Sequence, residues 1–188
     1  YNSSGLIAQH LRPSSQAFYG ARPGIALYGV KPSLVNLSEA DLIRWKAIDL
    51  KPVMTLRSSL IGLHHLKAGE RVSYGGTWTA PCQSIIGVVS IGYADGYHRL
   101  VSNRGFLLYR GQRVPIVGRV CMDYLMVDLT SVVGESGVKR SAKIGEEVVL
   151  FGEQQGATLG VEELSTWAET ISYEILTGIS ARIPRQWI

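Results

Sequence analysis

Short apolar runs separated by glycine-rich turns dominate the chain from residue 53 onwards. In one run Val127 and Leu129 occupy alternate positions, which is the pattern of a half-buried strand. Gly111 lies between two polar residues and suits a tight hairpin turn. The pattern predicts strands at residues 53–66, 84–92, 106–109, 114–117, 124–129 and 147–151. Many short strands joined by glycine turns favour a β-barrel or a β-sandwich.

The spacing of apolar residues changes to three and four near the end of the chain. This spacing predicts a single amphipathic helix. Glu162 and Glu163 stand where a helix N-terminus favours negative charge, and Gly178 is predicted to end the helix. Residues 179–183 are predicted to form a last strand. The apolar face of the predicted helix consists of Val161, Leu164, Ala168, Ile171 and Ile175.

The first 52 residues follow a different pattern. Residues 21–29 contain a short apolar run bounded by glycines, which predicts a buried strand. Residues 31–52 contain Pro32, Pro52 and a polar stretch, which predicts a connector and a domain boundary. The chain begins without a methionine, so we expect it to be a fragment of a longer protein.

Composition excludes several classes of protein. The net charge of +4 comes from 19 basic and 15 acidic residues, which are spread along the chain. Nucleic-acid-binding proteins usually gather basic and aromatic residues on one face, so we expect no nucleic-acid partner. No apolar run is long enough to span a bilayer and no signal peptide is visible, so we expect no membrane partner.

The cysteines and histidines give no metal or disulfide signal. Cys82 and Cys121 are not in a CxxC pair, and two cysteines are too few for a disulfide scaffold. We therefore expect a reducing compartment and a cytoplasmic location. The four histidines have no metal-ligand spacing with nearby carboxylates or thiols, so we expect no metal site.

Several polar motifs stand among the apolar runs, and each taken alone is an ordinary turn. Taken together and in order, they resemble the C-terminal part of alanine racemase, a fold-type III pyridoxal-phosphate enzyme, over essentially the whole chain. The motifs that carry the resemblance are Asn2-Ser3, residues 22–29, residues 70–75, residues 91–96, residues 118–123, residues 171–174 and residues 182–185.

The resemblance implies a mainly β fold. Residues 1–45 are expected to be the last strand and helix elements of a (β/α)8 barrel, and residues 46–188 a C-terminal, β-barrel-like domain. The segment between Ser3 and Arg22 is a few residues longer than the family's. The family's motif with the lysine that binds the cofactor covalently is not found in the chain, so we expect this fragment alone to be inactive.

The resemblance also implies a site for pyridoxal 5'-phosphate. Its phosphate would be bound by Asn2, Ser3 and the backbone amides of Gly24 and Ile25, since loops after the last barrel strands often hold a phosphate. Tyr173 matches a tyrosine whose hydroxyl donates to the same phosphate.

Arg22 matches the arginine that faces the pyridine nitrogen of the cofactor. A guanidinium has no acceptor and keeps its proton, so the ring nitrogen stays neutral. A neutral ring withdraws fewer electrons, which favours quick reprotonation of the α-carbon over side reactions such as transamination.

Racemisation needs one base on each face of the α-carbon. Tyr74 matches one base, and the lysine outside this chain is the other. A tyrosine needs a nearby positive charge to act as a base at neutral pH. Met122, through its backbone amide, and Tyr93 match a substrate-carboxylate contact and a gate to the site. The family implies that all three act in the active site of a partner subunit.

The resemblance therefore implies a homodimeric enzyme that interconverts L- and D-alanine and supplies D-alanine for peptidoglycan. A racemase for another amino acid such as serine is one alternative. A non-catalytic β-domain that only binds or dimerises is another. A fold-type III decarboxylase ranks lower, because the motifs around Tyr74 and Met122 favour the racemase.

Overall fold

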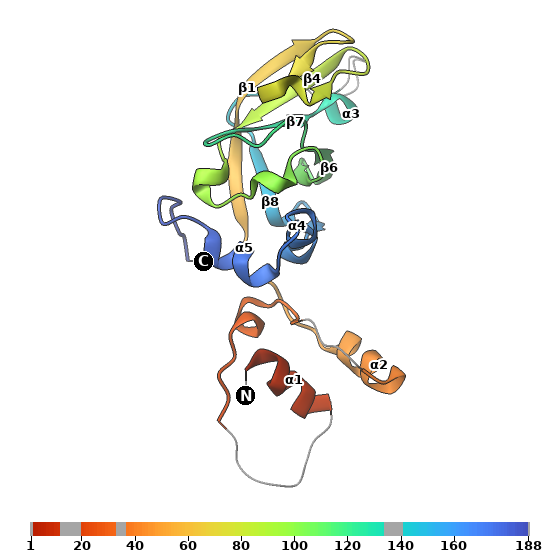
Figure 1. The fold of residues 1–188 in the computed structure, drawn as a ribbon, viewed down its shortest axis with the longest axis vertical. Helices are drawn as coiled ribbons and strands as arrows, with labels where there is room; N and C mark the ends of the chain where they lie inside the picture. The colour runs from red at the N-terminus through yellow and green to blue at the C-terminus, as the bar shows by residue number, and fades with distance from the viewer. Residues whose placement is uncertain (1, 12–19, 33–36, 134–140, 188) are drawn as a thin grey trace. The chain divides into compact units, whose positions relative to one another are not determined.

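The structure is a computed structural model that describes residues 2–11, 20–32, 37–133 and 141–187. The chain forms two compact units, Tyr1–Met54 and Thr55–Ile188, each of which is described by itself (Figure 1). The expected assignment of residues 1–45 to a barrel domain and 46–188 to a β-domain stays a prediction.

The first unit has a 3-10 helix where the sequence predicts a strand and an α-helix where it predicts a connector. Its elements are α1 (Ser3–Leu11), η1 (Ile25–Tyr28) and α2 (Glu39–Ala47). The prediction of a strand in residues 21–29 is wrong, because these residues form the 3-10 helix η1. Ser38 begins α2 by accepting the Asp41 amide on its hydroxyl, a common N-cap interaction that the connector prediction overlooked.

Gly29 allows the end of η1 to lie against the segment that leaves α2. It has a φ of 72°, and a Cβ placed there would lie 1.9 Å from the carbonyl oxygen of Lys51. The Val53 amide donates to the Tyr28 carbonyl at 3.2 Å in the same place. Only a residue without a side chain permits this contact.

The second unit is built on an antiparallel sheet in which β1 is the longest strand. The strands are β1 (Leu56–Leu66), β4 (Ser84–Val89), β5 (Phe106–Tyr109), β6 (Gln112–Pro115), β7 (Leu125–Asp128), β8 (Glu147–Gln154) and β9 (Ala157–Leu159). Their order is β6-β5-β8-β1-β4-β7, with β9 paired to β8. The predicted runs correspond to β1, β4, β5, β7 and β8, β6 begins two residues before its predicted run, and β9 was not predicted.

The sheet curls until its two ends meet. The first half of β1 pairs with β8 and the second half with β4, with register shifts in both pairings. Such bulges bend strands. At the ends of the path, Ile116 forms an antiparallel bridge with Val127, and the Val117 amide donates to the Met126 carbonyl at 2.9 Å. The expected barrel-like, mainly β fold is confirmed.

The core lies inside this curled sheet. Alternate side chains are buried in β7, whereas β5 and β8 bury successive side chains and are therefore covered on both faces. Gly87 in β4 is packed so tightly that a Cβ would lie 2.8 Å from a methyl group of Leu60. The fully buried side chains include Leu60, Val89, Leu107, Leu108, Leu125, Val127, Val148, Val149 and Leu150.

Smaller elements connect the strands and follow them. They are a two-stranded sheet of β2 (Arg71–Val72) and β3 (Trp78–Thr79), η2 (Tyr74–Gly76), η3 (Tyr93–Asp95), η4 (Arg99–Val101), α3 (Thr130–Val133), α4 (Val161–Trp167) and α5 (Ser172–Gly178). The predicted single helix after residue 161 is two helices, because Glu169 between them has a φ of 54°. Residues 179–183 form turns, so the strand predicted there is wrong.

The turn before β8 holds a carboxylate that hydrogen bonds to β5 and its hairpin. Glu146 accepts the Tyr109 hydroxyl, and Arg110 donates to both of its carboxylate oxygens, at 2.7 and 2.9 Å. Burial raises the pKa of Glu146, but the hydrogen bonds from Tyr109, Arg110 and the Lys143 amide outweigh it and hold the pKa below the ordinary value of 4.5.

Glu146→Gln should make the stability of the chain less dependent on pH. A carboxylate with a lowered pKa contributes stability above its unfolded value, and this contribution is lost as the pH falls through the folded value. The free energy of unfolding, measured in urea between about pH 5 and pH 3, should therefore fall less steeply in Glu146→Gln than in the wild type. Glu153→Gln, at an exposed site on β8, is the control. Parallel curves for Glu146→Gln and the wild type would contradict the role of Glu146.

Candidate active site

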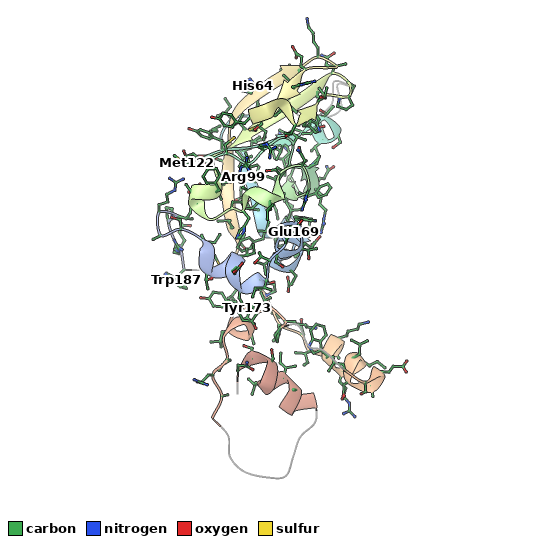
Figure 2. The ribbon with its side chains drawn as sticks, in the orientation of Figure 1. His64, Arg99, Met122, Glu169, Tyr173 and Trp187 are labelled. Atoms are coloured by element: carbon green, nitrogen blue, oxygen red, sulfur yellow. The ribbon has the colours of Figure 1, made fainter. Side chains whose placement is uncertain are left out.

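Three loops of the second unit surround a cavity of about 470 Å³. Tyr74 comes from η2, Tyr93 from η3, and Met122 from the loop before β7. The three residues assigned to catalysis and substrate by resemblance are thus brought together, and two arginines line the same cavity. The cavity is lined by Tyr74, Tyr93, Arg99, Arg119, Val120, Cys121, Met122, Asp123 and Tyr124, of which Figure 2 labels Arg99 and Met122.

The backbone around Tyr74 is fixed although its ring is not. Ser73, Gly75 and Gly76 have φ values of 66°, 73° and 53°. The Ser73 hydroxyl donates to the Arg119 carbonyl at 2.9 Å, which ties the turn to the next loop. The Tyr74 ring itself is 75% exposed. The phenol is therefore presented outward from a rigid support.

Gly92 brings the loops of Tyr93 and Met122 into backbone contact. The Tyr93 amide donates to the Cys121 carbonyl and the Ala94 amide to the Met122 carbonyl, both at 3.0 Å. A Cβ on Gly92 would lie 2.3 Å from the Cys121 carbonyl oxygen. The two loops therefore form one rigid piece, from which the side chains of Tyr93 and Met122 extend half-exposed.

Arg182 of the C-terminal segment joins the same two loops. Its Nε donates to Asp95 at 2.6 Å and its Nη2 to Asp123 at 2.7 Å. These hydrogen bonds, first to Asp95 and then to Asp123, raise the pKa of Arg182, so the guanidinium stays charged. Sequence reasoning gave Arg182 and Asp95 no role. The available signal was the presence of both in the motifs that carry the resemblance.

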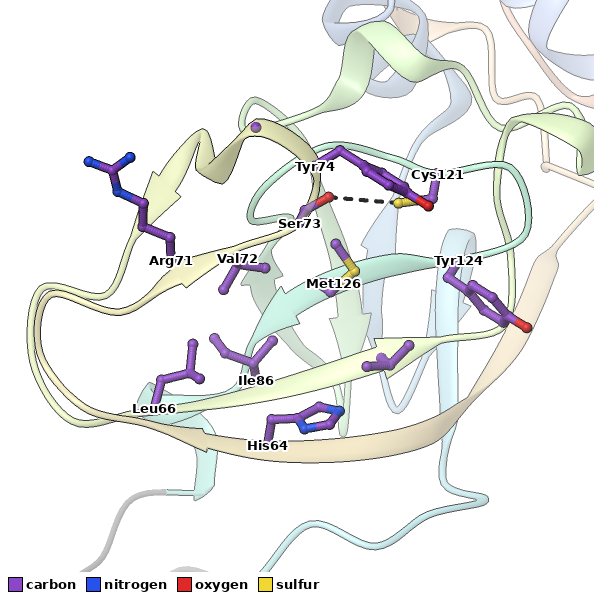
Figure 3. A pocket seen from close by; sticks show the side chains of 12 residues that line it. His64, Leu66, Arg71, Val72, Ser73, Tyr74, Ile86, Cys121, Tyr124 and Met126 are labelled. Carbon is purple, nitrogen blue, oxygen red and sulfur yellow. Dashed lines mark hydrogen bonds between the residues drawn. The ribbon is translucent and has the colours of Figure 1, made fainter.

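A second cavity, of about 650 Å³, is also lined by the turn of Ser73, Tyr74 and Gly75 (Figure 3). Its wall is mostly apolar and is formed by β1, β4 and β7, with Arg71 and His64 at its edge. The Ser73 hydroxyl oxygen and the Cys121 sulfur lie 3.7 Å apart in this wall, where the dashed line joins them. Tyr74, Cys121 and Tyr124 line both cavities.

The first unit holds a separate cluster around Ser3. Asn2 begins α1 and its side chain accepts the Gly5 amide at 2.9 Å. The buried Ser3 hydroxyl accepts the amides of Gly24 and Ala26, at 2.8 and 3.2 Å. The structure thus brings together Asn2, Ser3, Gly24 and Ile25, as the sequence predicts for one site.

This cluster fits a phosphate group in part, because the Gly24 amide, one of the expected donors, donates to the Ser3 hydroxyl instead. A serine oxygen has two acceptor positions, so accepting two amides leaves the Ser3 proton free to donate to an anion. The N-terminus of α1 also favours a negative charge. At Gly24 a Cβ would meet no atom nearer than the Ser3 hydroxyl at 4.0 Å, so the backbone there is open to a ligand.

Two other predicted cofactor residues are exposed. Arg22 precedes Gly24 by two residues and its side chain is exposed. Tyr173 belongs to the second unit, on the first turn of α5, and is 42% exposed (Figure 2). Their roles toward the cofactor stay predictions.

Neither a metal site nor a membrane span is found in the part of the chain that the structure describes. No group of three His, Cys, Asp or Glu side chains gathers among those residues. None of the described helices is long and apolar enough to cross a membrane.

Comparison with known proteins assigns the second unit to one class, the C-terminal domains of enzymes of the alanine racemase type. The chain belongs to the alanine racemase family, whose C-terminal domain model matches residues 53–187. The alanine racemase of Desulfosudis oleivorans is 46% identical over 164 residues, which are 87% of this chain and 38% of that protein. The chain therefore spans about two fifths of the length of this relative.

Solved structures agree with the family. Alanine racemase from Bacillus anthracis, solved with bound L-Ala-P, matches with a TM-score of 0.80 and 33% identity, over 100% of this chain and 43% of that one. The Bartonella henselae enzyme, solved with covalently bound pyridoxal phosphate, matches with a TM-score of 0.71 and 33% identity. That match covers 89% of this chain and 41% of the other. The resemblance inferred from the sequence motifs is confirmed.

Gly92→Ala should destabilise the chain by about 1–3 kcal/mol, because the added methyl group overpacks against fixed backbone. The measurement is the free energy of unfolding in urea. Gly178→Ala is the matched control, since a Cβ there meets nothing within 4 Å. Equal stability of Gly92→Ala and Gly178→Ala would show that the contact between the two loops is not tight.

Proposed function

We propose that this chain is the C-terminal part of an alanine racemase that interconverts L- and D-alanine with pyridoxal 5'-phosphate. The observation that carries the proposal is the cavity in which Tyr74 lies with Tyr93 and Met122, in a chain of this family. The name of the relatives and the alanine analogue and cofactor in their structures support it.

Tyr74 is proposed to transfer the proton on one face of the substrate α-carbon. Its phenol oxygen removes the α-proton from one enantiomer or returns it to the other. The ring is exposed on a fixed turn, which suits a base that must reach a substrate bound outside its own loop. Arg119 runs beside this turn, with its Nε 4.0 Å from where a Gly75 Cβ would be.

Met122 and Tyr93 are proposed to bind and orient the substrate. The backbone amide of Met122 donates to the substrate carboxylate, and the Tyr93 ring narrows the approach to the site. The guanidinium groups of Arg99 and Arg119 in the same cavity attract a negatively charged carboxylate. The loops are rigid, so little entropy is lost when these groups engage the substrate.

The first unit is proposed to bind the cofactor as the end of a (β/α)8 barrel. Asn2, Ser3 and the amides of Gly24 and Ile25 hold the phosphate, the Gly24 amide by turning away from the Ser3 hydroxyl to which it donates. The role proposed for Tyr173, which belongs to the second unit, rests on the family resemblance alone. Arg22 faces the pyridine nitrogen. When bound, pyridoxal phosphate makes the α-proton acidic by withdrawing electrons from the α-carbon.

The assembly is proposed to be a homodimer in which Tyr74, Tyr93 and Met122 serve the partner's active site. The lysine that binds the cofactor lies outside this chain and serves the opposite face of the substrate. We place the enzyme in the cytoplasm, where it supplies D-alanine for peptidoglycan.

Tyr74→Phe in the full-length enzyme tests the assignment of the base. The change keeps the ring and removes the hydroxyl, so racemisation should fall roughly 100- to 10,000-fold. Deuterium uptake from solvent should fail for the enantiomer whose hydrogen faces Tyr74 and survive for the other. Tyr124→Phe, in the same cavity, is the matched control and should keep both exchanges. Normal exchange of both enantiomers in Tyr74→Phe would exclude Tyr74 as the base.

Mixed dimers test the shared site. Tyr74→Phe subunits combined with subunits that lack the cofactor lysine should recover about one active site per mixed dimer, because a two-fold interface pairs each tyrosine with the other subunit's lysine. If no activity returns on mixing, Tyr74 does not act across the interface.

Arg22→Glu in the full-length enzyme should raise the fraction of turnovers that end in transamination. A carboxylate would hold a proton on the ring nitrogen, which strengthens electron withdrawal and slows reprotonation of the α-carbon. The measurements are pyruvate formed per racemisation event and the absorbance spectrum at long wavelength. Arg22→Lys, which keeps the cation, should change the partition less. An unchanged partition and spectrum in Arg22→Glu would show that Arg22 does not face the ring.

A further inference from the structure

Arg182 is the one residue of the C-terminal segment, among those described, whose side chain bonds to both substrate-facing loops. Asp95 ends η3, which begins with Tyr93, and Asp123 directly follows Met122. Arg182 uses two different nitrogens for the two carboxylates, at 2.6 and 2.7 Å. The three side chains come from positions that are 87 and 59 residues apart in the chain.

Asp95 is fixed from several sides. It is 6% exposed, and its second carboxylate oxygen accepts the Gly92 amide at 2.9 Å. Its backbone carbonyl accepts the Ser180 amide at 2.9 Å, which also ties η3 to the C-terminal segment. Any movement of Arg182 is therefore transmitted to the loop of Gly92 and Tyr93.

The C-terminal turn that presents Arg182 is itself held by a second arginine. Arg185 donates to the carbonyls of Ser180 and Ile183 from Nη1 and to that of Ile179 from Nη2, at 2.6, 2.7 and 2.9 Å. The turn therefore does not depend on the bonds of Arg182. The fold of the turn and the bridge that Arg182 makes to the two loops can therefore be tested independently.

The planar guanidinium suits this bridge better than any other cation. Its nitrogens lie in a fixed fork that can hold two carboxylates at a set spacing, whereas an ammonium is a point charge on a flexible stem. Asp95 and Asp123 each bond to the same group, so they would repel each other without it.

We propose that Arg182 is a positioning residue, which reinforces the backbone contact between the loops of Tyr93 and Met122 and so determines substrate affinity. The inference rests on the proposed function. Met122 contacts the substrate carboxylate before and during the proton transfer, so a displaced amide weakens ground-state and transition-state binding alike. Tyr74 lies on a turn that Arg182 does not bond to, and this turn is tied to the Met122 loop at Arg119, four residues before Asp123. The loss should therefore fall on KM and spare kcat.

Arg182→Met in the full-length enzyme tests the proposal. KM for alanine should rise roughly tenfold, with kcat little changed, as for the loss of charge-assisted hydrogen bonds that orient a binding group. Arg182→Lys should restore KM only in part. Tyr74→Phe has the opposite signature, a loss in kcat. Arg113→Met is the matched control. Arg113 forms a bidentate ion pair with Glu163, at 2.6 and 2.8 Å, is exposed to a similar extent, and does not line the cavity.

Hydrogen exchange gives a readout that does not require activity. The amides of Tyr93 and Ala94 donate to the Met122 loop, so peptides that span residues 91–97 should exchange faster in Arg182→Met and not in Arg113→Met. Asp123→Asn, a milder change at a half-buried site, should show the same effects if Arg182→Met does not fold.

The outcomes separate the two proposals. A higher KM together with faster exchange supports the positioning role, and an unchanged KM or unchanged exchange in folded Arg182 and Asp123 variants overturns it. If the wild-type enzyme does not racemise alanine, the proposed function is wrong. Faster exchange in that case still supports the link between the loops, while its absence overturns both.

Discussion

The second unit depends on the way that β1 divides its hydrogen bonds between two neighbours. Leu60, which is fully buried, lies where the pairing passes from β8 to β4. Its amide donates to the Glu146 carbonyl and its carbonyl accepts the Gly145 amide, while its Cα faces Val89 of β4. A strand held on both sides through a bulge must bend, and its bend curls the sheet until β6 and β7 meet. The loops that carry Tyr93 and Met122 extend from this curled sheet.

Local patterns were sufficient to predict the strands. Alternation and glycine turns depend only on neighbouring residues, so the runs that became β1, β4, β5, β7 and β8 were identified within a few residues. The helix errors have equally local causes. Apolar spacing continues through residue 169, but the positive φ of Glu169 breaks the helix there, and spacing gives no sign of it. Residues 25–28 are too short a run to distinguish a strand from a 3-10 helix by periodicity.

The site could be predicted only as a set of residues and not as an arrangement. Motif order identified Tyr74, Tyr93 and Met122, and the structure places them around one cavity. Their supports are contacts between distant segments, such as Ser73 with Arg119 and Gly92 with Cys121. The same holds for Ser3 and Gly24 in the first unit. No pattern within a short window encodes such contacts, since they depend on how the finished sheet and turns bring the chain together.

At Tyr74 the backbone and the side chain differ in conformational freedom. Its backbone takes left-handed conformations at Ser73, Gly75 and Gly76, and the Ser73 hydrogen bond to Arg119 holds it in place. The ring, three-quarters exposed, keeps the freedom of its side chain. A surface that covers the ring must offset the free-energy cost of the side-chain entropy lost when the ring is fixed, which is on the order of 1 kcal/mol. The tyrosine is thus only half preorganised, and its final orientation belongs to the molecule that binds over it.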